Sequence, residues 1–325
     1  MASADPTATI LVIAYRMQAT IGAAVRSAMA QTHPCEIIVS DDSSDDDTFA
    51  AAVAAAAGYE GPHTIHVRRT AQNLGLCAHL NELAALAQGD VLVFLAGDDL
   101  AYPARVQTLL AAFRSEPHAL VVGSAVDEID LEGKLIRPRV RALPRNVDQR
   151  WFLRRGKMTT VLGASMAVRR ELITEFPPLV GSIEDNMLSL RAVLAGDCVC
   201  LQEPLLGYRR HAGNFAKWVF DRSESDYASF ERRNRRVIAL YRDIAADQER
   251  CVAARPALDA ERRRLGLELA DMYRLEADMR EAILDRPRRE WLPFLARGLR
   301  HPGLRRKSIE RSLKLLLPRK MRFGR

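Results

Sequence analysis

Two adjacent aspartates stand where a buried strand is expected to end. Asp98 and Asp99 closely follow Val91–Leu95, five consecutive apolar residues that favour a strand covered on both faces. Neighbouring carboxylates repel each other unless a cation or hydrogen-bond donors compensate their charge. A hard divalent ion such as Mg²⁺ or Mn²⁺, shared with the phosphates of a substrate, meets that need. The pair is therefore a candidate metal site.

A second acidic segment, residues 41–47, follows another strand-like run, Ile37–Val39. It begins with Asp41 and Asp42. In an open sheet of parallel strands, ligands bind at the carboxyl ends of the strands, and this rule brings the segment to the same edge as Asp98. A turn rich in aspartate and serine is also typical of a solvated loop that caps a helix. The residues alone leave both interpretations open.

The elements that must position these carboxylates alternate in type. Strand-like runs and segments of helical periodicity follow each other up to about residue 123, which predicts an α/β fold, with a Rossmann-like, mostly parallel sheet and helices on both faces. The runs are Thr9–Ala14, Ile37–Val39, Thr64–Val67, Val91–Leu95 and Ala119–Val122. A hairpin turning at Glu132-Gly133, a strand over 164–168, a helix over 186–194 and a strand over 199–208 are expected next. Beyond residue 215 the pattern is helical, so we expect domains over 1–215 and 216–325.

The composition is that of a soluble protein. Of the 325 residues, 48% are hydrophobic and 27% are charged. The five scattered cysteines form no zinc pattern and are expected to be free thiols in a reducing cytoplasm. The polar start is unlike a signal peptide, and no apolar run reaches the roughly 18 residues that a membrane-spanning helix needs. We therefore expect a cytoplasmic protein.

The net charge of +7 is concentrated at the end of the chain. Residues 286–325 contain 14 Lys and Arg but 2 Asp and Glu, so they carry +12, and the preceding residues carry −5. Leucines interleave with these basic residues, which favours contact with an anionic membrane surface, here the inner face of the cell membrane. Helical packing against the catalytic domain is the alternative, and residues 223–290 are a candidate homodimer contact. No nucleic-acid recognition motif is present.

In order along the chain, six segments resemble the motifs of family 2 glycosyltransferases, which have the GT-A fold. The resemblance covers about residues 8–215. It rests on Asp41-Asp42-Ser43-Ser44, on Asn73-Leu-Gly75 through Asn81 to Gly89-Asp90, on Gly97-Asp98-Asp99 with Pro103 and Arg105, on Val122-Gly-Ser124 with Ile129-Asp-Leu-Glu-Gly133, on Glu184-Asp185 with Arg191, and on Tyr208-Arg209-Arg210-His211 with Asn214.

The resemblance implies a role for each matching residue. Ala14 and Tyr15 would lie against the nucleobase and ribose, and Asp41 or Asp42 would accept a hydrogen bond from the base, which suits UDP or dTDP. Asn73, Asp98 and Arg209 would bind the nucleotide sugar. Asp99 would bind the metal, with His211 as a further ligand and Asp98 as an additional candidate. Asp185 would be the general base, with Glu184 on the acceptor side. Trp151 and Trp218 are candidates for stacking on an acceptor sugar or for core packing.

The implied activity is that of an inverting, metal-dependent glycosyltransferase. It would move a sugar from a nucleoside-diphosphate sugar to a hydroxyl of a glycan or lipid-linked acceptor in bacterial surface polysaccharide biosynthesis. Two residues depart from the family pattern: Ala96 stands where an aspartate is frequent, and Leu80 where an arginine is frequent. The alternatives are a sugar nucleotidyltransferase, which needs a glycine-rich basic loop after the first strand, and a non-catalytic nucleotide-sugar-binding scaffold protein.

Overall fold

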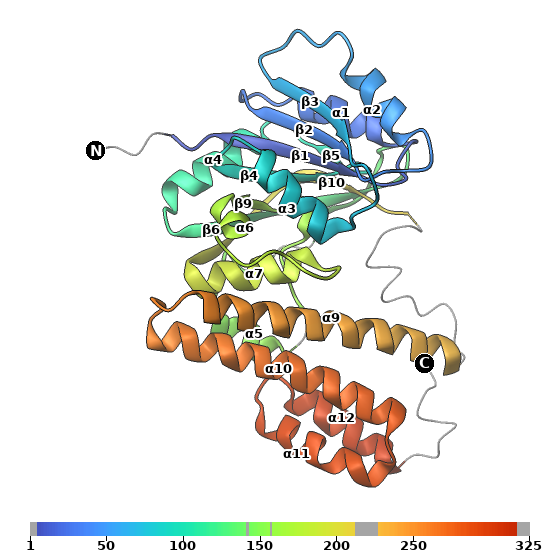
Figure 1. Cartoon of the computed structure of the whole chain (residues 1–325), viewed down its shortest axis with the longest axis vertical. Coiled ribbons are helices and arrows are strands. Elements are labelled where there is room, and N and C mark those ends of the chain that lie inside the picture. Colours follow the sequence, from blue (N-terminus) through green and yellow to red (C-terminus); the bar gives the residue numbers. More distant parts are fainter. Residues whose placement is uncertain (1–4, 141–142, 157, 212–226, 317–325) are drawn as a thin grey trace. The chain divides into compact units, whose positions relative to one another are not determined.

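The computed structural model describes residues 5–140, 143–156, 158–211 and 227–316. The chain divides into two compact units (Figure 1). The sheet unit comprises Met1–Val147 and Thr160–Arg210, and the helical unit comprises Asp148–Thr159 and His211–Arg325. The predicted domain boundary after residue 215 lies close to the last of the three crossings between them, which follows Arg210. The earlier excursion at Asp148–Thr159 is not part of that prediction.

The sheet unit is built on one ten-stranded sheet with the order β3-β2-β1-β4-β9-β6-β10-β5, with β7 beside β6 and β8 beside β10. Strands β3, β2, β1 and β4 are parallel, whereas β9 runs antiparallel between β4 and β6. The α/β fold with a mostly parallel sheet is thus confirmed. The strands are β1 (Ala8–Ala14), β2 (Glu36–Asp41), β3 (Thr64–Arg69), β4 (Val91–Ala96), β5 (Leu100–Ala101), β6 (Ala119–Ile129), β7 (Leu135–Val140), β8 (Asn146–Val147), β9 (Ala167–Arg169) and β10 (Asp197–Arg209).

Helices cover the centre of the sheet because its strands β1, β2 and β4 are buried on both faces. Ile10, Val12 and Ala14 of β1 share a core cluster with α1, α2 and α4, and α6 packs against both α3 and α7. Leu11, between Ile10 and Val12, is equally buried. These elements are α1 (Ile21–Met29), α2 (Thr48–Ala56), α3 (Leu76–Leu86), α4 (Arg105–Ser115), the 3₁₀ turn η1 (Gly163–Ser165), α6 (Glu171–Thr174) and α7 (Glu184–Ala195).

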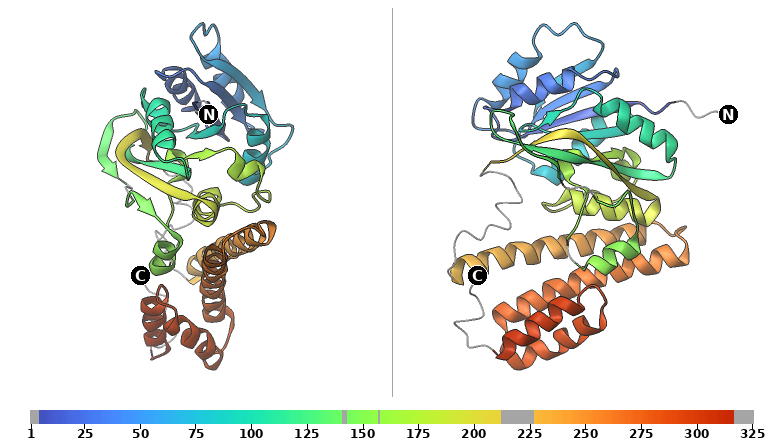
Figure 2. Two further views of the ribbon diagram at one scale, coloured as in Figure 1. Left: turned by 90° about the vertical axis from the view of Figure 1, so that its left-hand side faces the viewer. Right: turned by 180° about the vertical axis from the view of Figure 1, so that it is seen from behind.

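The helical unit centres on two long helices that lie side by side (Figure 2). It consists of α5 (Gln149–Arg155), α9 (Tyr227–Ala254), α10 (Ala260–Asp285), η2 (Arg288–Trp291), α11 (Leu292–Arg300) and α12 (Arg305–Leu316). Glu276 of α10 is fully buried between basic side chains, with Lys307 Nζ at 3.2 Å and Arg311 Nη2 at 2.8 Å from its Oε1. In the part of the chain that the structure describes, no helix is both long and apolar enough to span a bilayer.

Candidate active site

The carboxyl ends of β1, β2 and β4 meet at one edge of the sheet. Ala14, the last residue of β1, is paired with Asp41 at the end of β2, and its carbonyl oxygen accepts a hydrogen bond from the Asp42 N–H at 2.8 Å. On the other side, the Gly97 N–H donates to the carbonyl oxygen of Ile13 at 2.9 Å. The two acidic segments therefore flank β1, as the parallel arrangement requires.

The loops after β1 and β2 hold two non-glycine residues in the left-handed backbone region. Arg16 has a φ of 55° and Ser43 a φ of 58°. The loops are tied together, because the Arg16 N–H donates to Ser44 Oγ at 2.8 Å and its guanidinium pairs with Asp45 at 2.7 Å. Such conformations are costly and concentrate at ligand sites. Here they lie next to Tyr15, which is 40% exposed.

The carboxylate of Asp41 organises its own turn. Its oxygens accept hydrogen bonds from the N–H and the Oγ of Ser44, and Oδ2 lies 3.4 Å from Arg69 Nε. The Arg69 guanidinium also donates to the Ser44 carbonyl oxygen. Asp41 is buried. The carboxylate beneath the loop is therefore hydrogen-bonded by Ser44 and its negative charge is balanced by Arg69.

The carboxylate of Asp42 reaches in the other direction, to the loop before α3. It accepts hydrogen bonds from the N–H groups of Leu74 and Gly75, both at 2.9 Å, and from Thr70 Oγ1 at 3.1 Å. The side chain of Asn73 donates to the Asp42 carbonyl oxygen at 3.0 Å. Asp42 and Asn73, both predicted to bind the nucleotide sugar, thus form one hydrogen-bonded group.

Asp98 and Asp99 occupy the turn between β4 and β5. Asp99 is fully buried, and its Oδ1 accepts a hydrogen bond from the Arg209 N–H at 2.8 Å. Among the described residues its Oδ2 is buried without a hydrogen-bond partner. Burial and the charge of Asp98 raise the pKa of Asp99 well above its ordinary value, and Arg209 and Arg105 oppose this shift. A buried carboxylate oxygen of this kind is strongly stabilised by a cation.

Arg209 fixes the turn that carries these aspartates. Its Nε donates to the Asp98 carbonyl oxygen at 2.7 Å, and its Nη1 donates to the carbonyl oxygens of Asp130, at 2.8 Å, and Leu131. The guanidinium therefore ties the turn to the β6–β7 hairpin. A contact of Arg209 with a diphosphate stays a prediction.

Glu184 and Asp185 open α7, where the helix dipole favours negative charge. A Cβ added to Gly163 of η1 would lie 2.4 Å from Glu184 Oε1 and 3.4 Å from the Asp185 Cβ, so the pair rests directly on this glycine. Asp185 Oδ1 accepts a hydrogen bond from the Asn186 N–H at 2.7 Å. Burial and the charge of Asp185 raise the pKa of Glu184 to about 8.

Asp99 fits a metal that is shared with a substrate. Within the described ranges, no group of three or more His, Cys, Asp or Glu side chains is placed to hold a metal ion. Mg²⁺ is commonly held by one or two carboxylates together with substrate phosphates, and the partnerless Asp99 Oδ2 supplies such a carboxylate. His211, two residues after Arg209 in the chain, stays a predicted further ligand.

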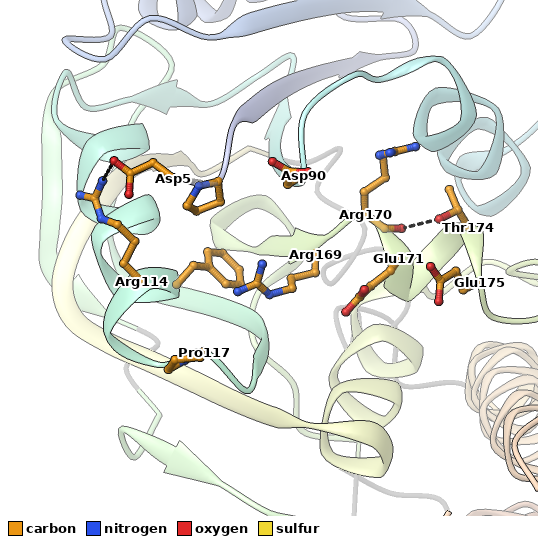
Figure 3. A pocket seen from close by; sticks show the side chains of 11 residues that line it. Asp5, Asp90, Arg114, Pro117, Arg169, Arg170, Glu171, Thr174 and Glu175 are labelled. Carbon is orange, nitrogen blue, oxygen red and sulfur yellow. Dashed lines mark hydrogen bonds and ion pairs between the residues drawn. The ribbon is translucent and has the colours of Figure 1, made fainter. Parts of the chain in front are cut away.

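A cavity of about 670 Å³ lies at the opposite edge of the sheet (Figure 3). It is lined by residues that precede β1 and β4 and by the ends of α4 and β9, and no predicted site residue lines it. Arg114 pairs with Asp5 at 3.4 Å, and Asp90 accepts two hydrogen bonds from Thr7. The cavity is separate from the candidate active site.

Most predicted site residues of the sheet unit meet around the edge described above. The two aromatic candidates are not among them. Trp151 is part of the helical unit, in α5, where Arg155 stacks over its ring at 5.0 Å, and Trp218 lies outside the described residues. Two residues given no role from the sequence take part in the structure, namely Arg105 and Gly163. Arg105 belongs to the family motif that contains Asp99, whereas only its proximity to Glu184, which the sequence does not reveal, marks Gly163.

Comparisons with known proteins show relatives of similar sequence and of similar fold. The chain is 30% identical over 142 residues to EpsE of Bacillus subtilis (strain 168), whose name describes it as a glycosyltransferase; the match covers 42% of this chain and half the length of that relative. TarS 1-349 of S. aureus, solved in complex with UDP-GlcNAc, has a similar fold, with a TM-score of 0.55 and 16% identity over 97% of this chain and 85% of that one. The mannosyltransferase PcManGT of Pyrobaculum calidifontis, solved with GDP-Man and Mn²⁺, also has a similar fold. Its TM-score is 0.52 and its identity 19%, over 97% of this chain and 88% of that one.

A family model matches just over half of the chain. The model for glycosyl transferase family 2 matches residues 9–176, which include β1 to β9 and the Asp41-Asp42 and Asp98-Asp99 segments. The chain therefore belongs to glycosyl transferase family 2.

Proposed function

We propose that this protein transfers a sugar from a nucleoside-diphosphate sugar to a hydroxyl of a glycan or lipid-linked acceptor, with inversion at the anomeric carbon. The observation that carries the proposal is the Asp98-Asp99 turn at the carboxyl edge of the sheet, where the buried Asp99 Oδ2 has no hydrogen-bond partner among the described residues. The ligands named for the structural neighbours, UDP-GlcNAc and GDP-Man, support a nucleotide-sugar donor. The role of the Asp41-Asp42 loop at the base favours UDP or dTDP.

In this mechanism, the residues of the chain orient two substrates. Tyr15 and the Asp41-Asp42 loop bind the nucleoside, and Asp98 contacts the ribose and donor sugar. Asp185 accepts the proton of the acceptor hydroxyl as that oxygen attacks the anomeric carbon, a contribution of typically 10²–10⁴-fold. A bound Mn²⁺ or Mg²⁺, held by Asp99, would neutralise charge on the departing diphosphate.

A donor screen with matched variants tests this function. Transfer and donor hydrolysis would be measured over a panel of sugar nucleotides with Mn²⁺, and UDP binding by calorimetry. We expect Asp185→Asn to lower kcat by roughly 10²–10⁴-fold while UDP still binds, and Asp99→Ala to abolish binding and turnover together. Asp90→Asn, at the opposite edge of the sheet, is the control and should keep both.

Other outcomes favour other functions. Binding of sugar nucleotides without any turnover would support the non-catalytic scaffold protein. Synthesis of a sugar nucleotide from a nucleoside triphosphate would support the nucleotidyltransferase. Full transfer activity in both Asp99→Ala and Asp185→Asn would contradict the proposed site.

We further propose that α11 and α12 contact an anionic membrane that carries the acceptor. Leu292, Leu299, Ile309 and Leu313 are 38–58% exposed, and Arg300, Arg305 and Arg306 are exposed beside them. In contrast, Lys307 and Arg311 are turned inward to Glu276, so only part of the basic tail is available. Exposed basic residues near an anionic surface contribute about 1 kcal/mol each.

Vesicle sedimentation tests the membrane contact. The wild type should sediment with vesicles containing anionic lipid, and far less with neutral vesicles or in high salt, which screens surface charge. The triple variant Arg300→Glu, Arg305→Glu, Arg306→Glu should lose most of this binding. Equal binding of wild type and variant would contradict the proposal.

A further inference from the structure

A buried arginine links the two halves of the candidate site. Arg105, the first residue of α4, is 1% exposed, and its Nη2 donates to the carbonyl oxygens of Phe94 and Ala164, each at 2.7 Å. Phe94 belongs to β4, the strand that leads into Asp99. Ala164 belongs to η1, the turn on which the Glu184 carboxyl rests. One guanidinium therefore connects the strand of the metal-site carboxylate with the segment beneath the proposed base.

The same guanidinium is the buried positive charge behind Asp99. The Nε and Nη1 of Arg105 and the Oδ2 of Asp99 are all buried, and none has a hydrogen-bond partner among the described residues. The two groups nevertheless interact electrostatically. Native proteins rarely leave buried polar atoms unpaired, and removal of one member of a buried charge pair is strongly unfavourable. Three such atoms on two interacting groups indicate a functional constraint.

We propose that Arg105 is a positioning residue of the active site, which supplies the buried countercharge of Asp99 and holds η1 beneath Glu184 and Asp185. This inference rests on the proposed function, because it assigns Arg105 a role relative to those two carboxylates. Arg105 acts through its neighbours, without contact to substrate. Its positive charge stabilises the Asp99 carboxylate, and the N–H groups of its planar guanidinium donate a hydrogen bond to the Ala164 carbonyl oxygen. Substitution can separate the two effects, since lysine keeps the charge and loses the fork.

The countercharge is tested by thermal unfolding, without any ligand. Asp99→Asn would be measured in the wild type and in Arg105→Met, with Arg105→Gln as the substitute should the methionine variant not fold. We expect Asp99→Asn to be more favourable in the Arg105 variant than in the wild type, by roughly 3 °C or more in Tm. The reason is that, in the Arg105 variant, Asp99→Asn removes a buried carboxylate that no longer has the Arg105 countercharge. Equal effects in both backgrounds would overturn the countercharge.

Arg169→Met is the matched control for that experiment. Arg169 also lies in the sheet unit and donates through its Nε to a backbone carbonyl, that of Ala119 at 3.2 Å, but at the opposite edge of the sheet. In this background Asp99→Asn should change Tm as it does in the wild type. The same coupling at Arg169 as at Arg105 would mean that any lost arginine produces it, and would also overturn the proposal.

The positioning of η1 is tested by comparing UDP–Mn²⁺ affinity with kcat. We expect Arg105→Lys to keep the affinity within about threefold while kcat falls at least about tenfold, because small displacements of a base are costly. Arg105→Met should lose affinity as well, and Arg169→Met should keep both. If Tm, UDP–Mn²⁺ affinity and kcat all fall in parallel in both Arg105→Lys and Arg105→Met, the role of Arg105 is purely structural. Absence of nucleotide binding by the wild type would refute the proposed function, and the Tm coupling would still decide the countercharge.

Discussion

At the scale of single residues, the two neighbouring acids Glu184 and Asp185 differ in protonation. The raised pKa of Glu184, about 8, means that its carboxyl is mostly protonated at neutral pH. The pair therefore does not carry two negative charges on one helix start, and differing environments of two neighbouring acids are a common basis for separate roles.

The first prediction concerns pH and Glu184. Between its ordinary pKa of 4.5 and about 8, the folded protein holds a proton that the unfolded chain has released, so this group lowers stability as the pH rises. Glu184→Gln should therefore become more stable relative to the wild type from pH 5 to pH 8.5. Thermal unfolding of both proteins across this range measures the difference. A difference that does not change with pH would contradict it.

The second prediction concerns Gly163. A methyl group there would meet only the end of the Glu184 side chain closely, so Gly163→Ala should fold normally but displace that carboxyl. We expect kcat to fall about tenfold or more, with UDP affinity and Tm little changed. Gly22→Ala in α1, where the nearest contact is a flexible arginine tip at 3.3 Å, is the control and should leave kcat unchanged. A fully active Gly163→Ala enzyme would show that turnover does not depend on the position of the Glu184 carboxyl.

The sequence predicts the types of site residue better than their surroundings. Asp98 and Asp99 are identifiable because they closely follow an apolar strand. The hydrogen-bonding state of the Asp99 carboxylate is not identifiable from the sequence, because its hydrogen-bond donor, Arg209, lies 110 positions later in the chain. The anchoring of Arg209 on the β6–β7 hairpin is likewise a tertiary contact that no local pattern encodes.

At the scale of elements, Asp42 acts as a connector between β2 and the loop that leads to α3. Gly75, the N-cap of α3, has a φ of 77°, a conformation that favours glycine. Its N–H, with that of Leu74, is satisfied by the Asp42 carboxylate. The orientation of this loop therefore depends on one side chain from a different strand.

The third prediction follows from that connection. Asp42→Ala should leave two N–H groups and Thr70 unsatisfied, at a cost of about 1–3 kcal/mol, and should increase amide hydrogen exchange over residues 70–76. UDP affinity should fall with it. Asp47→Ala is the control, because Asp47 makes no side-chain hydrogen bond as the N-cap of α2. Unchanged amide hydrogen exchange in Asp42→Ala would show that the loop keeps its conformation without the Asp42 carboxylate.

The fold is predictable where an element's own residues determine it. The parallel centre follows from strands that are apolar on both faces, such as Thr9–Ala14 within β1. Strands β5 and β8 have two residues each and exist through pairing with β10, which leaves no local pattern. The run over 164–168 likewise becomes the 3₁₀ turn η1 followed by a short strand, because η1 is held by Arg105.

At the scale of the whole molecule, the helical unit depends on one buried ion cluster. Burial alone would raise the pKa of Glu276, but Arg311, Arg280 and Lys307 lower it to about 2. Removing the single anion of such a cluster leaves buried cations without compensation. The described tryptophans, Trp151 and Trp291, both belong to this unit, and the sheet unit contains no tryptophan, so tryptophan fluorescence does not report the unfolding of the sheet unit.

The fourth prediction uses this reporter. Glu276→Gln should destabilise the helical unit by roughly 3 kcal/mol at pH 7. The contribution of Glu276 is present above its unfolded pKa of 4.5 and is lost as the pH falls toward 2, so the two proteins should converge over that range. Glu268→Gln, which removes an exposed partner of Arg264 on the same helix, should change stability by under about 1 kcal/mol. Equal effects of the two substitutions would contradict the cluster's importance.

The excursion of residues 148–159 has a consequence for how this gene could be shortened or recombined. Gly156 meets the backbone of Gly303 so closely that a Cβ on it would lie 1.8 Å from the Gly303 carbonyl oxygen, and Phe152 is fully buried. A stop codon after residue 211 would therefore leave α5 in the middle of the chain with its apolar residues Phe152 and Leu153 uncovered, and the product should aggregate. Replacing 148–159 by a short glycine-serine bridge in the same gene should restore solubility. The helical unit is thus interlaced with the sheet unit at the level of the gene, and neither is inherited as a simple terminal cassette.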